Sequence, residues 1–182
     1  MSIPTFFQSA IDAIKQNNGM LLTSEPCPEE HLAHLEKKFD LSLPPSLREI
    51  LLWSNGVAVK YKESVVPLIF TLEEVEQATT SYRDGADEFA DPEVYDEDEI
   101  EEAMPVIHFV RRLFCVSRSD EAFADHHALY VPESGELKPF VTSLHHEDWE
   151  SYVDESNPPK ERLSLVEFVV NMVVQTANPL PG

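Results

Sequence analysis

Residues 30–56 decide the fold of this protein, and they read EHLAHLEKKFDLSLPPSLREILLWSNG. In the first half, apolar side chains recur at the spacing of one helix face (Leu32, Leu35 and Phe39). The preceding Cys27-Pro28-Glu29-Glu30 favours a helix start, because proline fits the first turn and acids face the positive end of the helix dipole. This half therefore predicts an amphipathic helix.

A second helix is predicted after Leu43-Pro44-Pro45, where the prolines impose an extended entry and then suit a first helical turn. Its apolar stripe consists of Leu47, Ile50 and Leu51. Asn55-Gly56 ends this helix, since both residues tolerate the left-handed conformation. The segment thus predicts two helices joined by a short connection that contains prolines.

The order and spacing of these features resemble the SUKH superfamily, whose members carry a Smi/Knr-type domain. The resemblance rests on eight residues of the segment, which are Leu35, Glu36, Leu43, Pro44, Leu47, Leu51, Asn55 and Gly56. The closing stretch Leu163–Phe168 is also similar to the final helix of the family.

This resemblance implies an α+β fold with several strands and a role in protein binding. Many bacterial members are similar to immunity proteins, which neutralise toxin domains, frequently nucleases, that competing bacteria deliver. Eukaryotic members look like regulatory scaffolds. The family has no generally recognised catalytic set, so the resemblance implies no catalytic residue and no cofactor. The matched residues are expected to be structural, because they start, end and pack helices.

The remaining patterns predict further helices and strands. Helices are predicted over residues 5–17, from the capping box Thr71–Glu74 to about Arg83, and from Leu165 to about Thr176. The run Val65–Phe70, which is rich in β-branched residues, predicts a buried strand. Further strands are predicted at Pro105–Val110, Leu113–Ser117, Ala128–Pro132 and Lys138–Thr142. A turn at Glu133–Glu136 predicts a hairpin between the last two strands.

The C-terminal segment carries two conflicting signals. Its run Leu165–Val170 is rich in β-branched residues and fits a strand, whereas Ser164 and Glu167 form a capping box and the apolar pattern is too long for a typical strand. We predict a helix there. Residues 1–182 are then expected to form a single α+β domain with N-terminal helices, a central, mostly antiparallel sheet and a C-terminal helix.

The chain is strongly acidic, with 34 Asp+Glu against 13 Lys+Arg, a net charge of -21 and a pI near 4.5. Such a surface repels nucleic-acid phosphates and anionic lipid headgroups, so neither nucleic acid nor a membrane is an expected partner. It attracts basic surfaces and speeds encounter with them, and salt weakens this effect. Charge of this kind also serves solubility alone, so it does not identify a partner.

The charge is concentrated in residues 84–102, which carry eleven acids and no base. We predict an acidic insertion or loop there; Asp96–Ala103 could form a short helix, but its closely spaced like charges oppose one. The hypothesised partner-binding residues are Asp96, Glu97, Asp98, Glu99, Glu101, Glu102 and Tyr95. The alternative is a solvated loop with a few side chains docked to its own core.

The case for an enzyme is weak. No G-x-S-x-G, S-x-x-K, dinucleotide-binding or Walker pattern occurs in a supporting context. The doublets His126-His127 and His145-His146 do not readily offer two ligands to one metal, and His31 and His34 have no recognisable third ligand nearby. Cys27 and Cys115 are interpreted as ordinary thiols. We therefore expect no catalytic residue, metal or cofactor.

Three functions stay open at this point. The favoured hypothesis is an immunity-type inhibitor that masks a basic surface of a toxin, for example a nuclease. The second is a regulatory or scaffolding protein that binds a cellular partner, and the least supported is a metal-dependent enzyme. A cytoplasmic location is expected, because the N-terminus lacks the features of a signal peptide and no apolar run approaches about 20 residues.

Overall fold

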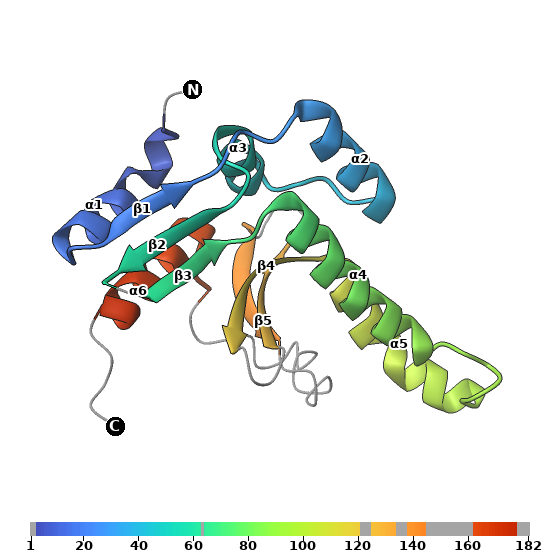
Figure 1. The fold of residues 1–182 in the computed structure, drawn as a ribbon. Helices are drawn as coiled ribbons and strands as arrows, with labels where there is room; N and C mark the ends of the chain where they lie inside the picture. Colours follow the sequence, from blue (N-terminus) through green and yellow to red (C-terminus); the bar gives the residue numbers. More distant parts are fainter. Residues whose placement is uncertain (1–2, 63, 121–124, 134–137, 145–161, 178–182) are drawn as a thin grey trace.

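The structure is a computed structural model that describes residues 3–62, 64–120, 125–133, 138–144 and 162–177. It confirms the α+β fold, with two three-stranded antiparallel sheets (Figure 1). The elements in chain order are η1 (Thr5–Phe7), α1 (Gln8–Gln16), β1 (Met20–Thr23), α2 (Glu29–Phe39), α3 (Pro45–Trp53), β2 (Val57–Tyr61), β3 (Ser64–Ile69), α4 (Leu72–Glu88), α5 (Glu97–Arg111), β4 (Leu113–Asp120), β5 (Asp125–Tyr130), β6 (Phe140–Leu144) and α6 (Leu165–Ala177). None of the helices in these ranges is both long and apolar enough to cross a membrane.

The first sheet, in the order β1-β2-β3, buries one of its two faces. The row Leu21, Val59 and Val66 lies in register across the three strands and packs in the main hydrophobic core. Helix α6 lies on this side of the sheet, where the hydroxyl of Tyr61 donates to the backbone oxygen of Val173 at 3.4 Å (Figure 1). Side chains alternate between the faces of a strand, so the neighbouring residues face the other way.

The second sheet, in the order β4-β5-β6, is covered on both faces. Along β4, Leu113 and Cys115 join the cluster formed with α4 and α5, whereas Phe114 and Val116 join the main core with α6. Because side chains on both faces of β4 are buried, the sequence at the start of this strand is continuously apolar. The two sheets meet where the amide of Phe70 donates to the backbone oxygen of Val116 at 2.7 Å. The second sheet therefore lies between the α4–α5 pair and α6.

The predicted helices of residues 30–56 are confirmed, and so are the N-terminal and C-terminal helices. The leucines expected to fill the core are buried, with Leu32, Leu35, Leu47 and Leu51 fully inaccessible. At the C-terminal helix, the Ser164 hydroxyl and the Glu167 carboxylate make the reciprocal bonds of a capping box. Hydrogen bonds from Ser164 lower the pKa of Glu167. The capping box therefore prevails over the β-branched composition of this segment.

The strands predicted at Val65–Phe70, Leu113–Ser117, Ala128–Pro132 and Lys138–Thr142 correspond to β3, β4, β5 and β6. The last two pair in antiparallel fashion, as the hairpin prediction requires. The tip of the predicted turn, residues 134–137, lies outside the described residues.

The strand predicted at Pro105–Val110 is wrong, because this run forms the second half of α5. Only Ile107 and Val110 of the run are buried, which is helical rather than alternating spacing. Strands β1 and β2 were not predicted, and α4 continues beyond Arg83 to Glu88. The acidic residues 84–102, expected to form an insertion or loop, instead comprise the end of α4, a connection and the start of α5.

Candidate functional site

Helices α4 and α5 lie side by side and form a hairpin, which we call the acidic arm (residues 72–111). Figure 1 shows the arm reaching past the second sheet, with the connection between its helices at the far end. Its inner side packs on that sheet through Tyr82, Ala86, Ile107 and Val110. The arm therefore holds its acidic end away from the main core while its inner side is anchored in the second hydrophobic cluster.

Helix α4 begins at a capping box whose two halves are both present. The backbone amide of Thr71 donates to the Glu74 carboxylate at 2.8 Å, and the Glu74 amide donates to the Thr71 hydroxyl at 3.3 Å. The next amide, that of Leu72, donates to the side-chain oxygen of Asn55 at 2.7 Å. These bonds satisfy amides that a helix start leaves without internal partners, so they fix where the arm leaves the body.

Helix α5 begins in the same way, although its first residues are all acidic. The amide of Asp96 donates to the Glu99 carboxylate and the amide of Glu99 donates to the Asp96 carboxylate, both at 3.0 Å. Glu97 and Asp98 lie in the first turn, where the helix dipole favours negative charge. The cap and the dipole thus offset the like-charge repulsion that argued against a helix at Asp96–Ala103.

The structure brings the predicted binding residues together at the far end of the arm. All six acids are exposed (Asp96, Glu97, Asp98, Glu99, Glu101 and Glu102). Tyr95 is half-buried and its ring packs against Phe89, with 5.8 Å between the centroids. Beside it, Val94 is 66% exposed. An apolar side chain therefore lies next to the cluster of carboxylates.

The six acids divide into two groups by their contacts. Asp96 and Glu99 form the cap of α5, a role that was not predicted from the sequence. Glu97, Asp98, Glu101 and Glu102 make no side-chain hydrogen bond or ion pair with any other described residue. Asp98, Glu101 and Glu102 together line one open hollow on the surface. Within the described part of the chain, these four carboxylates are therefore available to a partner.

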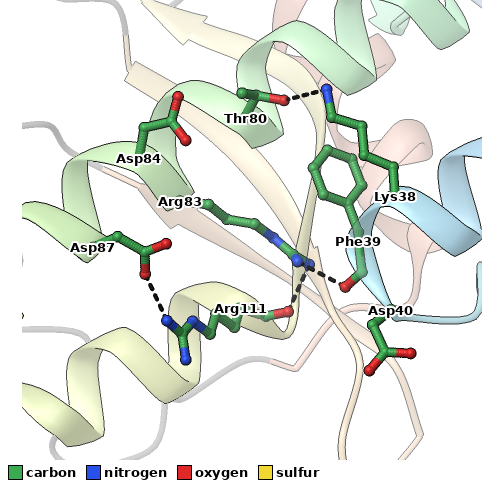
Figure 2. A pocket seen from close by; sticks show the side chains of 8 residues that line it. All are labelled: Lys38, Phe39, Asp40, Thr80, Arg83, Asp84, Asp87 and Arg111. Atoms are coloured by element: carbon green, nitrogen blue, oxygen red, sulfur yellow. Dashed lines mark hydrogen bonds and ion pairs between the residues drawn. The ribbon is translucent and has the colours of Figure 1, made fainter.

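A second pocket lies at the base of the arm, and Figure 2 shows that its cationic side chains already have partners. Arg83 donates to the backbone oxygen of Phe39 at 2.9 Å and to that of Arg111 at 2.6 Å, so it joins the C-terminal ends of α2 and α5. Arg111 in turn pairs with Asp87 at 2.9 Å, and Lys38 with Glu76 at 2.8 Å. The side chains of this pocket therefore connect α2, α4 and α5 at the base of the arm, and we call this set of contacts the joint.

The surroundings of Arg83 also shift its pKa. Its guanidinium carbon lies 4.5 Å from the centre of the Phe39 ring. Burial, and after it the neighbouring charge of Arg111, lower the pKa of Arg83 from 12.5 to about 10. The side chain therefore stays charged at neutral pH and holds the base of the arm through charge-assisted hydrogen bonds.

Two residues of the family motif, Glu36 and Asn55, make hydrogen bonds within the fold. Glu36 accepts the amide of Leu43 at 2.9 Å and pairs with Arg48 at 3.0 Å, so it fixes the connection between α2 and α3. Arg48 also pairs with Glu29. Asn55 binds the first amide of α4, as described above. The hydrogen-bonding roles of Glu36 and Asn55 were not predicted from the sequence.

The histidines do not assemble a site within the described residues. His31 and His34 are exposed on α2. His126 packs edge-on against Phe70 and Tyr82, whereas His127 packs on Phe168 from the other side of the sheet. His145 and His146 lie outside the described residues. No group of three or more His, Cys, Asp or Glu in the part of the chain that the structure describes could hold a metal ion.

Cys115 is fully buried in β4, and burial raises its pKa to about 12. We expect this thiol to resist alkylation in the folded protein and to react once denaturant is added, because the thiolate is the reactive species. A Cys27→Ser variant, in which Cys115 is the single cysteine, tests this with a chromogenic thiol reagent. Rapid labelling without denaturant would contradict the burial.

The same shift predicts a pH dependence of stability. The folded state disfavours the Cys115 thiolate, so the contribution of this thiol is fully present below its unfolded pKa of about 8.5. It is lost as the pH rises from there towards about 12. The free energy of unfolding should therefore fall more steeply over this range in the wild type than in a Cys115→Ala variant.

The chain matches a known protein family. Residues 26–156 match the model of the SMI1 / KNR4 family (SUKH-1). No curated protein matches the chain. The match begins just before α2 and includes the two motif helices, strands β2 and β3 of the first sheet, the acidic arm and the second sheet, whereas α1, β1 and α6 lie outside it. Since it spans more than half of the 182 residues, the chain belongs to the SMI1 / KNR4 family (SUKH-1).

Proposed function

We propose that this protein is an immunity-type inhibitor that masks a basic surface of a toxin domain, for example a nuclease. The proposal is supported by the family and, above all, by the four free carboxylates on the first turns of α5 (Glu97, Asp98, Glu101 and Glu102). Nucleases present cationic surfaces to bind phosphates. A row of carboxylates that covers such a surface excludes the substrate by offering similar charge.

The spacing of these carboxylates favours a positively charged partner. Glu97 and Glu101 are four residues apart on the helix, and so are Asp98 and Glu102. Like charges at this spacing repel each other on one face of a helix. A basic surface relieves this repulsion when it binds, and this relief favours the binding of a positively charged partner. Val94, exposed beside them, offers an apolar contact within the charged surface.

The proposal predicts that a toxin domain is encoded beside the gene. The test uses that domain and a variant that neutralises only the four free carboxylates (Glu97→Gln, Asp98→Asn, Glu101→Gln and Glu102→Gln). Asp96 and Glu99 are kept because they cap α5. We expect association at low salt to slow by about tenfold or more and dissociation to change less, because exposed charges mainly steer encounter. Raising the salt should reduce the difference.

A matched control removes the same charge elsewhere, with glutamine at four exposed glutamates outside the arm's tip (Glu25, Glu30, Glu49 and Glu73). If the control variant also associates more slowly, and by the same factor, the net charge of the protein and not the acidic arm determines the association rate. Unchanged binding by the arm variant would refute the assigned surface. A neighbouring gene unrelated to toxins, with capture of a housekeeping protein, would favour the regulatory or scaffolding alternative.

A further inference from the structure

The acidic arm ends in a segment that belongs to neither hydrophobic cluster. Ala90 and Ala103 are the last side chains that pack against the second cluster on the two sides of the arm's turn. Between them the structure describes every residue, and none of residues 91–102 is buried or packs against a cluster. We call residues 91–102 the distal segment, and Figure 1 shows it at the end of the arm, away from both sheets. The apolar burial that stabilises the rest of the fold is therefore missing from it.

The contacts that shape the distal segment are local. The Asp91 carboxylate accepts the Glu93 amide at 2.8 Å, and the Asp96–Glu99 capping box begins α5. The Tyr95 ring packs on Phe89, which lies only two residues before the segment. Among the described residues, no hydrogen bond or ion pair joins the distal segment to the sheets or to the N-terminal helices. The segment is therefore held in shape by contacts with itself and its nearest neighbours.

A proline separates the acidic turns of α5 from its packed turns. Pro105 lies inside α5 and has no amide hydrogen, so the backbone oxygen of Glu101 lacks the donor that a continuous helix supplies. The buried residues of α5, Ile107 and Val110, both follow Pro105. The acidic turns before the proline are therefore weakly coupled to the turns that pack on the second sheet.

Charge also acts against the closed form of the distal segment, which carries eight acids and no base. Glu97 and Glu101 repel each other across one helical turn, and so do Asp98 and Glu102. None of the eight acids pairs with a cation in the described part of the chain. Few buried contacts mark a region that opens locally at a lower free energy than global unfolding, and this repulsion lowers it further.

We propose that the distal segment opens and closes as a unit of its own while the base of the arm and both sheets stay folded, and that a basic partner holds it closed. The opening is a property of the protein alone, whereas the closing step rests on the proposed function. The helix places the four free carboxylates side by side, so a cationic surface binds the closed form more tightly than the open one. Such a difference in affinity shifts the population toward the closed form.

Amide hydrogen exchange of the purified protein, measured by NMR, tests the opening. We expect the amides of residues 100–104 to exchange about 100-fold faster, or more, than those of Ile107 and Val110. Low concentrations of urea should change their exchange little, because a local opening exposes little surface. Equal protection throughout α5 would overturn the proposal.

A variant of the main core separates local from global opening. Ile50 is fully buried in α3, and Ile50→Val should accelerate exchange in the sheets severalfold because it destabilises the whole fold. The amides of residues 100–104 should exchange as in the wild type. If they accelerate as much as the sheets do, the distal segment opens only when the whole protein unfolds, and the proposal fails.

Pro105→Ala restores the missing amide and is expected to slow exchange of residues 100–104 by about tenfold or more, since an internal proline destabilises a helix. Pro92→Ala is the matched control, because Pro92 lies in the turn before α5 and interrupts no helix. It should change exchange little. Equal exchange in the two variants would contradict the role of Pro105 as the boundary.

An oligolysine peptide tests the closing step in place of the basic partner. It should slow exchange of residues 100–104 by a factor that grows with its concentration, because it binds the closed form preferentially. The variant that neutralises the four free carboxylates should lose this protection. A peptide that binds and leaves exchange unchanged would overturn the closing step. Since no toxin enters these measurements, a protein that opens and closes as expected but binds no toxin would refute the proposed function alone.

Discussion

Replacing Gly56 with alanine is expected to lower the free energy of unfolding by about 2–4 kcal/mol, the sum of backbone strain and crowding. Gly56 has a φ of +95°, a conformation that L side chains rarely adopt. An added Cβ would lie 2.9 Å from the Thr71 methyl carbon and 3.2 Å from the Thr71 backbone nitrogen. Thr71 caps α4, so it cannot move away without disturbing the start of the acidic arm.

The same substitution at Gly85 provides a control with the opposite sign. Gly85 lies within α4, and its φ is not positive. Gly85→Ala should therefore raise the free energy of unfolding by about 0.5–1 kcal/mol through helix propensity. Urea denaturation followed by circular dichroism measures both variants. Equal effects at the two positions would show that the backbone at Gly56 carries no special constraint.

Replacing Glu36 with alanine is expected to cost about 2–3 kcal/mol of stability, the range for losing charge-assisted hydrogen bonds and leaving a donor unsatisfied. One oxygen of Glu36 accepts the Leu43 amide at 2.9 Å, and the other pairs with Arg48 at 3.0 Å. The variant loses both contacts. It should loosen the connection between α2 and α3, which hydrogen exchange at the Leu43 amide would report directly.

Two controls separate the parts of this effect. Glu36→Gln keeps an oxygen that can accept from Leu43, and it should lose less than Glu36→Ala because only the charge is removed. Glu30→Ala removes an exposed carboxylate from the first turn of the same helix and should change stability by less than about 1 kcal/mol. If Glu36→Ala matched Glu30→Ala, the contacts of Glu36 would contribute nothing measurable.

The helices were predictable where capping and periodicity agree. Pro44 and Pro45 at a helix start and the capping boxes at Thr71 and Ser164 act within a few residues, so the sequence displays them directly. The end of α3 was predicted less well, because the helix stops at Trp53 with an extended Ser54, before the predicted stop at Asn55-Gly56. These local devices, together with buried apolar stripes, account for the success over residues 30–56 and at α6.

The secondary-structure predictions were wrong or missing where tertiary packing determines whether a segment is a helix or a strand. Val106–Val110 has the composition of a strand, but the capped start at Asp96 and burial against the second sheet make it helical. Strand β1 has four residues and depends on pairing with β2, as the register Leu21–Val59 shows. A strand this short carries too little pattern of its own. The alternation Val57, Val59 and Tyr61 was a usable signal for β2.

The candidate site was predictable in position but not in its internal division. Counting charge locates the cluster at Asp96–Glu102, and the structure shows all six of its carboxylates exposed. The count does not reveal that Asp96 and Glu99 are occupied with each other's amides. Which acids cap the helix depends on the residue at which α5 begins. The sequence did not indicate that residue, because the closely spaced like charges argued against a helix.

The way α5 begins has a consequence for how such a protein diversifies. Asp96 and Glu99 provide the cap, and the side chains at positions 97, 98, 101 and 102 make no hydrogen bond or ion pair within the described part of the chain; at the first two of these positions the helix dipole favours an acid. Their replacement by other helix-compatible residues leaves the body and the base of the arm undisturbed. Single substitutions at these positions can therefore change which partner binds without changing the stability of the rest of the fold.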